Sequence, residues 1–304
     1  MRTVTLIASA TEIVCALGFR KHLVGRSHEC DYPPSVVRLP VCSQPKINIH
    51  TSASQIDKQV KAVLQNALSV YQVDTEKLKA LKPDVIITQD HCEVCAVSLK
   101  DVKQAVCNWL NVCPKIISLH PQKLEDLWKG IQQVAQALGQ PRRGEVLIKK
   151  LKLRLKNIQQ KVRSSWPKPT VACIEWFQPL MAAGNWVPEM VEMLGAKNLF
   201  GKAGKHSPWM SWEQLQQKDP DIIILMPCGW DIKRSRHEIS VLTQRRGWRN
   251  LKAVRQNQVY LADGNQYFNR PGPRLVESFE ILAEIFYPQH FPPCHKGSGW
   301  QKLR

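Results

Sequence analysis

The densest group of side chains with chemical potential lies at residues 88–98, TQDHCEVCAVS. His91 is followed directly by Cys92, and Cys95 comes three positions later. Imidazole and thiolate groups bind zinc and other soft metals, but a structural zinc site needs four ligands. Cys228, in a loop of the second half of the chain, is the candidate for the fourth. The C-x-x-C spacing alone is not a strong zinc signature, but a metal site formed by His91, Cys92, Cys95 and Cys228 is one interpretation.

Three other roles fit the same cysteines. Cys92 and Cys95 are one helical turn apart near an expected helix start, where a helix dipole lowers a thiol pKa and favours a redox pair. The aromatic and proline context of thioredoxin is absent, and the histidine precedes the cysteines, unlike in the C-x-x-C-H haem motif. The thiols also suit a packing role in the loop, or a ligand site in which a thiolate coordinates the metal of a bound molecule. The ligand site is our leading interpretation.

Enzyme signatures are weak elsewhere. The sequence has no G-x-S-x-G, no Walker loop, and no G-x-G-x-x-G after a strand. Glu12 and Glu175 lie at the ends of expected strands, where carboxylates can serve as acid or base groups. We favour instead a role in capping helix amides. For the polar stretch SHECD at 27–31, we expect a locally hydrogen-bonded turn.

These residues must be positioned by alternating strands and helices. Short apolar runs predict strands, and segments with 3.6-residue periodicity predict helices. Strands are expected at 3–9, 23–27, 85–88, 116–119, 171–176, 221–226 and 258–262. Helices are expected up to Gly18 with Ser9 or Thr11 as the cap, and at 53–68, 74–83, 124–138, 142–164, 187–195, 211–220 and 272–288.

The second half of the chain repeats the first. TEKLKALKPDVIITQDHC superposes on SWEQLQQKDPDIIILMPCG, so that Pro83-Asp84 matches Pro220-Asp221. Each half also opens with a strand, a polar loop and a helix that closes in Leu-Gly. Two matches in the same order predict two similar α/β lobes. We expect an N-terminal lobe at 1–121, a helical connection at 122–168, a C-terminal lobe at 169–290, and a flexible tail at 291–304.

Alternating strands and helices imply a parallel sheet in each lobe, which is a Rossmann-like arrangement. Such sheets bind ligands outside the carboxyl ends of their strands, here at 9–12, 88–95, 175–186 and 226–231. Two lobes joined by a long rigid helix would face these loops across a cleft. Aromatic side chains there suit a flat, apolar ligand that a few polar groups orient. The ligand-binding residues expected are Ser9, Thr11, Glu12, Cys92, Cys95, Trp176, Asn185, Trp186, Trp209, Trp230, Tyr267, Phe268 and Arg270.

The net charge and the sequence of the first 20 residues indicate which partners and which cellular location to expect. The chain has 43 Lys and Arg against 25 Asp and Glu, a net charge of +18. Residues 142–168 hold ten basic residues and one acid, which we interpret as the solvated face of a helix rather than a nucleic-acid site. No segment has the length of a membrane span. Residues 1–20 do not form a signal peptide, so a cytoplasmic protein with reduced thiols is expected.

Four stretches resemble a known family: TVTLIASATEIVCALGF, SHECDYPP, EWFQPLMAAGNWVPEMVEMLGA and DGNQYFNRPGPRLVE. They are similar to class III solute-binding proteins, specifically the cobalamin-binding protein family of ABC importers, over about residues 2–290. The resemblance implies two lobes linked by a rigid helix and a large corrin or metal-chelate ligand between them. The family's Ser-Ala-Thr-Glu loop matches residues 9–12, and its Gly-Asn-Trp matches residues 184–186.

The chain departs from this family in two ways. Secreted members have a signal peptide or lipid anchor, and a misassigned start would make this chain periplasmic like them. Importer members dock a permease through an acidic residue on each lobe, and no such pair is placed here.

The function expected is therefore a non-enzymatic, monomeric carrier of a cobalamin-like corrinoid or other metal chelate. It needs no cofactor, and an ABC permease is the partner that the resemblance implies. The alternative is an intracellular metal- or thiol-dependent enzyme, or a metal-binding protein, centred on His91, Cys92 and Cys95.

Overall fold

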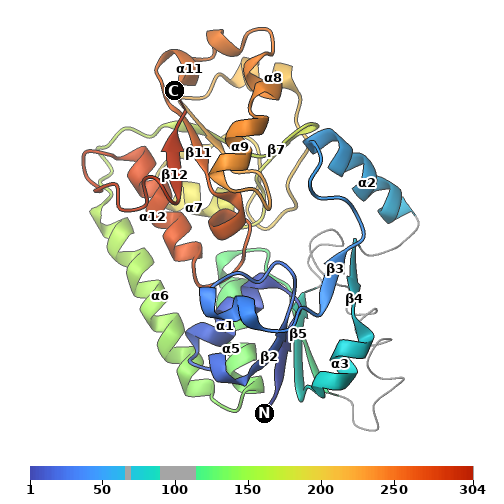
Figure 1. Cartoon of the computed structure of the whole chain (residues 1–304). Helices are drawn as coiled ribbons and strands as arrows, with labels where there is room; N and C mark the ends of the chain where they lie inside the picture. The colour runs from blue at the N-terminus through green and yellow to red at the C-terminus, as the bar shows by residue number, and fades with distance from the viewer. Residues whose placement is uncertain (66–69, 90–113, 304) are drawn as a thin grey trace. The chain divides into compact units, whose positions relative to one another are not determined.

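The structure, a computed structural model, describes residues 1–65, 70–89 and 114–303. Two compact units make up the chain (Figure 1). Unit 1 comprises Met1–Thr51, Gln55–Pro121 and Glu125–Leu151, and unit 2 comprises Ser52–Ser54, Gln122–Leu124 and Lys152–Arg304. The boundary falls inside helix α6 (Pro141–Lys161), within the region expected to connect the lobes. The lobe limits at 121 and 168 stay a prediction.

Unit 1 contains a parallel sheet in the order β2-β1-β5-β6. Its strands are β1 (Thr3–Thr5), β2 (Leu23–Arg26), β5 (Val85–Gln89) and β6 (Lys115–Leu119). Every residue of β5 is buried, so both faces of the sheet are covered, as in other parallel sheets. The remaining elements up to α6 are α1 (Ala8–Ala16), η1 (Arg20–His22), η2 (Pro34–Arg38), β3 (Ser43–Pro45), α2 (Ala53–Gln65), β4 (Tyr71–Val73), α3 (Thr75–Leu81) and α5 (Leu124–Ala137).

Unit 2 contains a six-stranded sheet in the order β12-β11-β10-β7-β8, with β9 also paired to β7. Its strands are β7 (Thr170–Phe177), β8 (Leu180–Ala182), β9 (Lys197–Asn198), β10 (Ile222–Leu225), β11 (Val259–Ala262) and β12 (Trp300–Lys302). Strands β7, β9, β10 and β11 are parallel, whereas β8 and β12 are antiparallel to their neighbours. The helices are α7 (Val187–Met193), α8 (Trp212–Lys218), α9 (Ile232–Glu238), α10 (Ser240–Thr243), η3 (Trp248–Asn250), α11 (Lys252–Arg255), η4 (Gly264–Phe268) and α12 (Leu275–Phe286).

The structure confirms the internal repeat predicted from the sequence, because the sheets of the two units have the same strand order. The order β2-β1-β5-β6 of unit 1 has its counterpart in the order β9-β7-β10-β11 of unit 2. Asp84 precedes β5, and its carboxylate accepts a hydrogen bond of 2.6 Å from the backbone N–H of Arg2. Asp221 precedes β10, and its carboxylate accepts one of 2.8 Å from the backbone N–H of Thr170. In each unit, therefore, an aspartate at the equivalent position binds the backbone at the start of the neighbouring strand.

Helix α1 starts earlier than expected and in a different manner. Strand β1 ends at Thr5, and the residue before the helix is Ile7, whose side chain makes no capping hydrogen bond. Thr11 does not cap the helix, because its hydroxyl lies 2.6 Å from that of Thr5 and donates to Cys30 Sγ at 2.9 Å. The expected capping role of Ser9 or Thr11 is wrong, since both residues lie within the helix.

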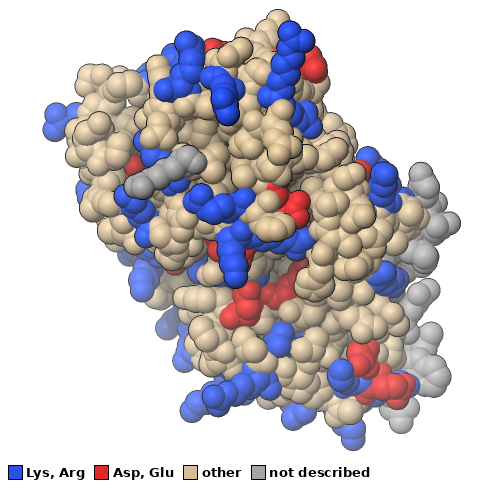
Figure 2. Space-filling model, turned by 45° about the horizontal axis from the view of Figure 1, so that its top comes forward, with Lys and Arg blue, Asp and Glu red and all other residues tan. Residues whose placement is uncertain are grey.

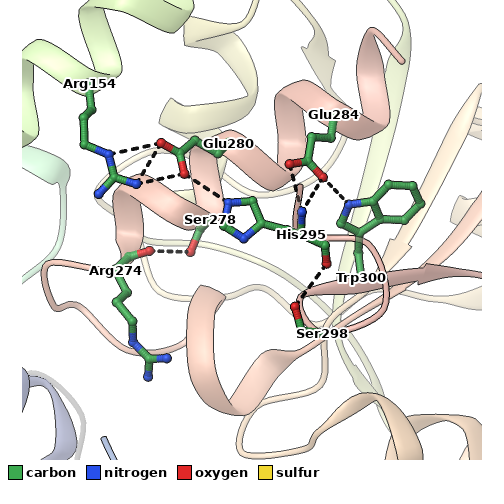
Figure 3. A network of polar contacts seen from close by, with 8 residues as sticks. All are labelled: Arg154, Arg274, Ser278, Glu280, Glu284, His295, Ser298 and Trp300. Atoms are coloured by element: carbon green, nitrogen blue, oxygen red, sulfur yellow. Dashed lines mark hydrogen bonds and ion pairs between the residues drawn. The ribbon is translucent and has the colours of Figure 1, made fainter. Parts of the chain in front are cut away.

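The C-terminal segment, expected to be a flexible tail at 291–304, is ordered over residues 291–303. Strand β12 pairs antiparallel with β11 and so closes one edge of the sheet. Trp300 is buried, and its indole nitrogen donates to Glu284 Oε2 at 2.6 Å (Figure 3). The Pro, Gly and Lys residues of this segment indicate a loop. Burial of the Trp300 side chain and the hydrogen bonds between β12 and β11 offset the conformational entropy that the segment loses on folding.

The segment also carries a histidine that joins an ion-pair network. His295 Nε2 lies 3.0 Å from Glu280 Oε2, and Arg154 from α6 donates to both oxygens of the same carboxylate (Figure 3). The hydrogen bond to Glu280 raises the pKa of His295 above its ordinary value, against the opposing effect of burial. Burial raises the pKa of Glu280, but the hydrogen bond from His295 and the charge of Arg154 outweigh it and hold that pKa below its ordinary value.

This network predicts a pH-dependent stability. Because the folded-state pKa of His295 is raised, its contribution is complete below the ordinary pKa of 6.5 and is lost as the pH rises through the raised value. A charged hydrogen bond in a partly exposed position is worth about 1–2 kcal/mol. Denaturant unfolding of wild type should show this loss, and His295→Gln should flatten it. His237→Gln, at a histidine whose side chain is 87% exposed, is the control that should keep the wild-type slope.

Candidate ligand-binding site

Three aromatic side chains gather at the carboxyl ends of β7 and β10 in unit 2. The ring centroids of Trp176 and Trp230 lie 4.9 Å apart, and Phe177 meets Trp230 edge-on at 5.8 Å. Trp176 is half-buried, whereas Phe177 and Trp230 are buried beneath it. We call these three residues the aromatic cluster. Ligands of open parallel sheets bind at this edge, so the cluster offers a floor for a flat apolar molecule.

The loop after β11 is tied to the loop after β10. Asp263 accepts hydrogen bonds from the backbone of Asn265 and Gln266, and burial raises the pKa of its carboxyl group. Asn269 donates to the carbonyls of Met226 and Gly264 at 3.0 and 2.9 Å. Gly264 lies so close to the Pro227 carbonyl oxygen that an added Cβ would overlap with it. These contacts hold the two loops in a fixed arrangement before any ligand binds.

The Gly-Asn-Trp turn is fixed in a similar way. Asn185 has a φ of 53°, a left-handed conformation that Asn adopts more readily than most residues. The Gly184 N–H donates to Ser207 Oγ, and the Ser207 hydroxyl donates to Glu175 at 2.9 Å. Glu175 therefore accepts a hydrogen bond from a side chain, and its expected role as a helix cap stays a prediction.

Arginines border this part of unit 2. The guanidinium of Arg234 lies 4.5 Å from the centre of the Trp230 ring, and burial lowers its pKa. Arg270 is buried and donates to Asn265 at 2.8 Å. Arg274 lies 5.3 Å from the Tyr267 ring centre. Cations beside aromatic rings suit a flat ligand that carries anionic groups at its edge.

Several expected ligand residues of unit 2 are buried, and their role as ligand contacts stays a prediction. Trp186 donates from its indole nitrogen to the Phe268 carbonyl at 2.8 Å, and both side chains are buried. The expected residues that are buried in unit 2 are Trp186, Trp230, Tyr267, Phe268 and Arg270. Those with accessible surface are Trp176, Asn185 and Trp209. Trp209 is 55% exposed and forms a β-bridge to Met181, the partner of Trp176 in the β7–β8 ladder.

The expected residues of unit 1 lie in the first turns of α1. Ser9, Thr11 and Glu12 are all buried. The Ser9 hydroxyl has no hydrogen-bond partner among the described residues, and the same holds for the side-chain oxygen of Gln89 at the end of β5. Glu12 lies inside the helix, so it does not cap it. The role of these three residues as ligand contacts stays a prediction.

The SHECD stretch forms the local hydrogen-bonded turn that we expected, since the Ser27 hydroxyl accepts from the Glu29 N–H and the Ser27 carbonyl accepts from the Cys30 N–H. His28 Nδ1 lies 2.9 Å from Ser43 Oγ, which donates to Ser27 Oγ. Burial and the nearby charge of Arg26 lower the pKa of His28 to about 4. This imidazole is therefore neutral at physiological pH.

The His-Cys-x-x-Cys loop lies outside the described residues, as do His91, Cys92 and Cys95. Cys228 is half-buried in the loop after β10. Within the described residues, no three His, Cys, Asp or Glu side chains gather in a way that could hold a metal ion. The metal site with ligands His91, Cys92, Cys95 and Cys228 stays a prediction.

The described cysteines are not joined to one another by disulfides. Burial raises the pKa of Cys15 to about 11, that of Cys42 to about 11 and that of Cys173 to about 12. A thiol with such a pKa is protonated at neutral pH, and a thiolate is what ligates a metal. These three cysteines therefore serve as small packing residues.

Paired α/β units with a long helix between them, and loops that carry aromatics at the carboxyl ends of the strands, define a two-lobed ligand-binding protein. The chain belongs to the periplasmic binding protein family, whose profile it matches over residues 4–265. The fold class expected from the sequence is confirmed, and so is the family resemblance. The family consists of binding proteins, so the enzyme alternative is not favoured.

Individual relatives agree with this placement. An ABC transporter substrate-binding lipoprotein of Bacillus subtilis (strain 168) is 26% identical over 95% of this chain and 81% of its own length. A vitamin B12-binding protein of Vibrio cholerae serotype O1 is 25% identical over 93% of this chain and 87% of its own length. A periplasmic haem-binding protein of Pseudomonas aeruginosa has the same fold, with a TM-score of 0.72 and 22% identity over 95% of this chain and 93% of that one.

The comparisons do not support the cytoplasmic location that we expected. One of these relatives is a lipoprotein, and another is periplasmic. In the part of the chain that the structure describes, no helix has the length and apolar character needed to cross a membrane.

Proposed function

We propose that this protein captures a cobalamin-like corrinoid, or another flat metal chelate such as haem, and delivers it to an ABC permease. The aromatic cluster at the carboxyl ends of β7 and β10 is the observation that carries this proposal. A tetrapyrrole or corrin ring is broad, flat and largely apolar, and it is matched by the half-buried indole of Trp176 over the buried rings of Phe177 and Trp230. Delivery to a permease would place the protein outside the cytoplasmic membrane.

Two further features support a ligand of this class. The loop that carries Trp230 is tied to the loop after β11 by Asn269 and by the Gly264 N–H before binding, which lowers the ordering cost of association. The guanidinium of Arg234 lies beside the cluster. Corrins and haems carry amide or carboxylate groups at the ring edge, and a guanidinium donates hydrogen bonds to both.

The experiment is a titration of purified, reduced protein with hydroxocobalamin, followed by visible absorption and tryptophan quenching, and then the same titration with haemin. Saturation near one equivalent with either compound supports the proposal, and the one that saturates identifies the ligand class. If both titrations are flat, the proposal is wrong. Uptake of labelled cobalamin or haem by cells in which the gene is disrupted tests the link to a permease.

Trp209→Ala is expected to weaken binding of the saturating ligand about 3–10-fold, the worth of an aromatic contact of about 0.5–1.5 kcal/mol. The side chain is 55% exposed, so the free energy of unfolding should change by less than about 0.5 kcal/mol. Isothermal titration calorimetry measures the affinity, and Trp209→Phe, which keeps a ring, should recover most of it. Equal affinity of wild type and Trp209→Ala would remove Trp209 from the ligand site.

A further inference from the structure

Helix α6 presents an exposed face that the binding function does not use. At 3.6 residues per turn, several of its residues share one side of the helix, away from the buried residues Leu151, Leu155 and Ile158. Two are large aliphatic residues, Val146 at 69% and Leu153 at 55% exposure. We define the α6 face as Val146, Lys149, Lys150, Leu153, Gln160 and Lys161.

The lysines of the α6 face are not neutralised. Within the described residues, no acidic side chain forms an ion pair with Lys149, Lys150 or Lys161. Residues 142–168 contain ten basic residues and a single acid, Glu145. Figure 2 shows one side of the molecule, on which Lys and Arg cover more of the surface than Asp and Glu. The α6 face therefore combines a positive potential with exposed apolar surface.

A hollow of about 520 Å³ adjoins this face at the end of α6. It is lined by Gln160, Lys161, Arg163, Trp166 and His290. The Trp166 and His290 rings stack with their centroids 3.8 Å apart, and Trp166 also contacts Tyr287 at 5.0 Å. Because Gln160 and Lys161 belong to both, the hollow opens on the same side of the helix as Leu153.

We propose that the α6 face and the Trp166 hollow form a docking surface for a bilayer that contains anionic lipids. Lysines on a helix are attracted to anionic headgroups, each contributing about 1 kcal/mol near the surface. Val146 and Leu153 enter the boundary between headgroups and acyl chains, and an indole fixed at the rim suits the same depth. The hollow, with Lys161 and Arg163 at its edge, receives a lipid phosphate.

Nucleic acid is the other polyanion that this charge could attract. Sequence-independent contact with single strands relies on aromatic rings on which bases stack, and the face of Trp166 is already stacked on His290. Phosphate backbones also give no reason for two exposed aliphatic side chains between the lysines. A lipid surface accounts for both the cations and the aliphatic residues.

The test is co-sedimentation of the whole protein with vesicles of phosphatidylcholine alone, and of phosphatidylcholine mixed with phosphatidylglycerol. Binding is expected to the mixed vesicles only and to weaken as salt is added. Replacing Lys149, Lys150 and Lys161 together by Gln should weaken it about 100-fold. As a control, Lys21, Lys58 and Lys218 are replaced together by Gln. These lysines are exposed but lie outside the α6 face, so their loss should weaken vesicle binding much less.

A second pair of variants separates apolar insertion from charge alone. Leu153→Glu should weaken binding to the mixed vesicles about tenfold. Val37→Glu makes the same change at an aliphatic residue of similar exposure, 50%, on η2, and should leave binding near wild type. Equal losses in Leu153→Glu and Val37→Glu, or in the two lysine triples, would overturn the proposal. Absence of binding to the mixed vesicles would also overturn it, and DNA binding that the α6 triple abolishes would then identify nucleic acid as the partner.

Discussion

Replacing Trp300 by Ala is expected to destabilise unit 2 by about 3–5 kcal/mol, the usual cost of emptying a buried tryptophan site. The side chain is only 6% exposed, and its ring meets that of Tyr260 edge-on at 5.6 Å. The substitution also removes the indole donor to Glu284, a carboxylate that is itself buried. Both losses fall on an edge strand of the sheet, since β11 is the neighbour of β12 among the described strands.

Hydrogen exchange read peptide by peptide is the appropriate measurement for Trp300→Ala, because the two units need not unfold together. Protection should fall in β11 and α12 and remain near wild type in β1 and β5. Trp209→Ala is the matched control, since it removes the same side chain from an exposed position. If Trp300→Ala leaves the protection of β11 unchanged, the segment 291–303 does not stabilise the sheet in solution.

Gly264→Ala is expected to destabilise the protein by about 1–3 kcal/mol or more, as overpacking does at rigid positions. The new Cβ would overlap with the backbone carbonyl of Pro227, which cannot rotate away as a flexible side chain would. The Gly264 N–H also donates to the Trp230 carbonyl at 3.0 Å, so the displacement reaches the aromatic cluster. Affinity for the ligand should therefore fall together with stability.

A glycine of opposite character provides the control for Gly264→Ala. At Gly130, within α5, an added Cβ would meet only Leu119 Cδ2 at 3.5 Å, an ordinary van der Waals distance. Gly130→Ala should therefore raise the free energy of unfolding by about 0.5–1 kcal/mol through helix propensity. Thermal or denaturant unfolding of wild type and both variants measures the two changes in the free energy of unfolding. A shift of the same sign in both would contradict the role assigned to Gly264.

The parallel sheets could be predicted because their central strands have an unambiguous pattern. Residues 85–87 and 222–226 are uninterrupted apolar runs that directly follow a Pro-Asp pair, which leaves few alternatives to a buried strand. The capped helix expected at 211–220 appears as α8, with Ser211 and Gln214 forming a capping box. Local signals of this kind can be recognised without knowledge of the tertiary structure.

Edge elements could not be predicted in the same way. Strands β8 and β12 span three residues each, too few to show a period, and they exist because a neighbouring strand offers unpaired backbone groups. The beginning of α1 was misjudged because Thr11 was available as a cap by type, while its hydroxyl is engaged by Thr5 and Cys30.

The exposure of the expected site residues could not be predicted from the sequence. The sequence shows that aromatics concentrate after strands, yet it does not show which rings are covered, because burial depends on contacts between distant segments. Trp186 and Trp230 thus look alike in sequence to Trp209, although only Trp209 is exposed. Arg234 was missed because a basic residue in a basic segment gives no signal until its distance to Trp230 is known.

The late position of β12 in the sequence has a consequence for biosynthesis. All four parallel strands of unit 1 lie within the first 119 residues, so this sheet can assemble while the ribosome is still translating the rest. The sheet of unit 2 lacks its β12 edge until residues 300–302 have left the exit tunnel, well after unit 1 has been synthesised. In the interval β11 has an unpaired edge, where a chaperone or another nascent chain can bind.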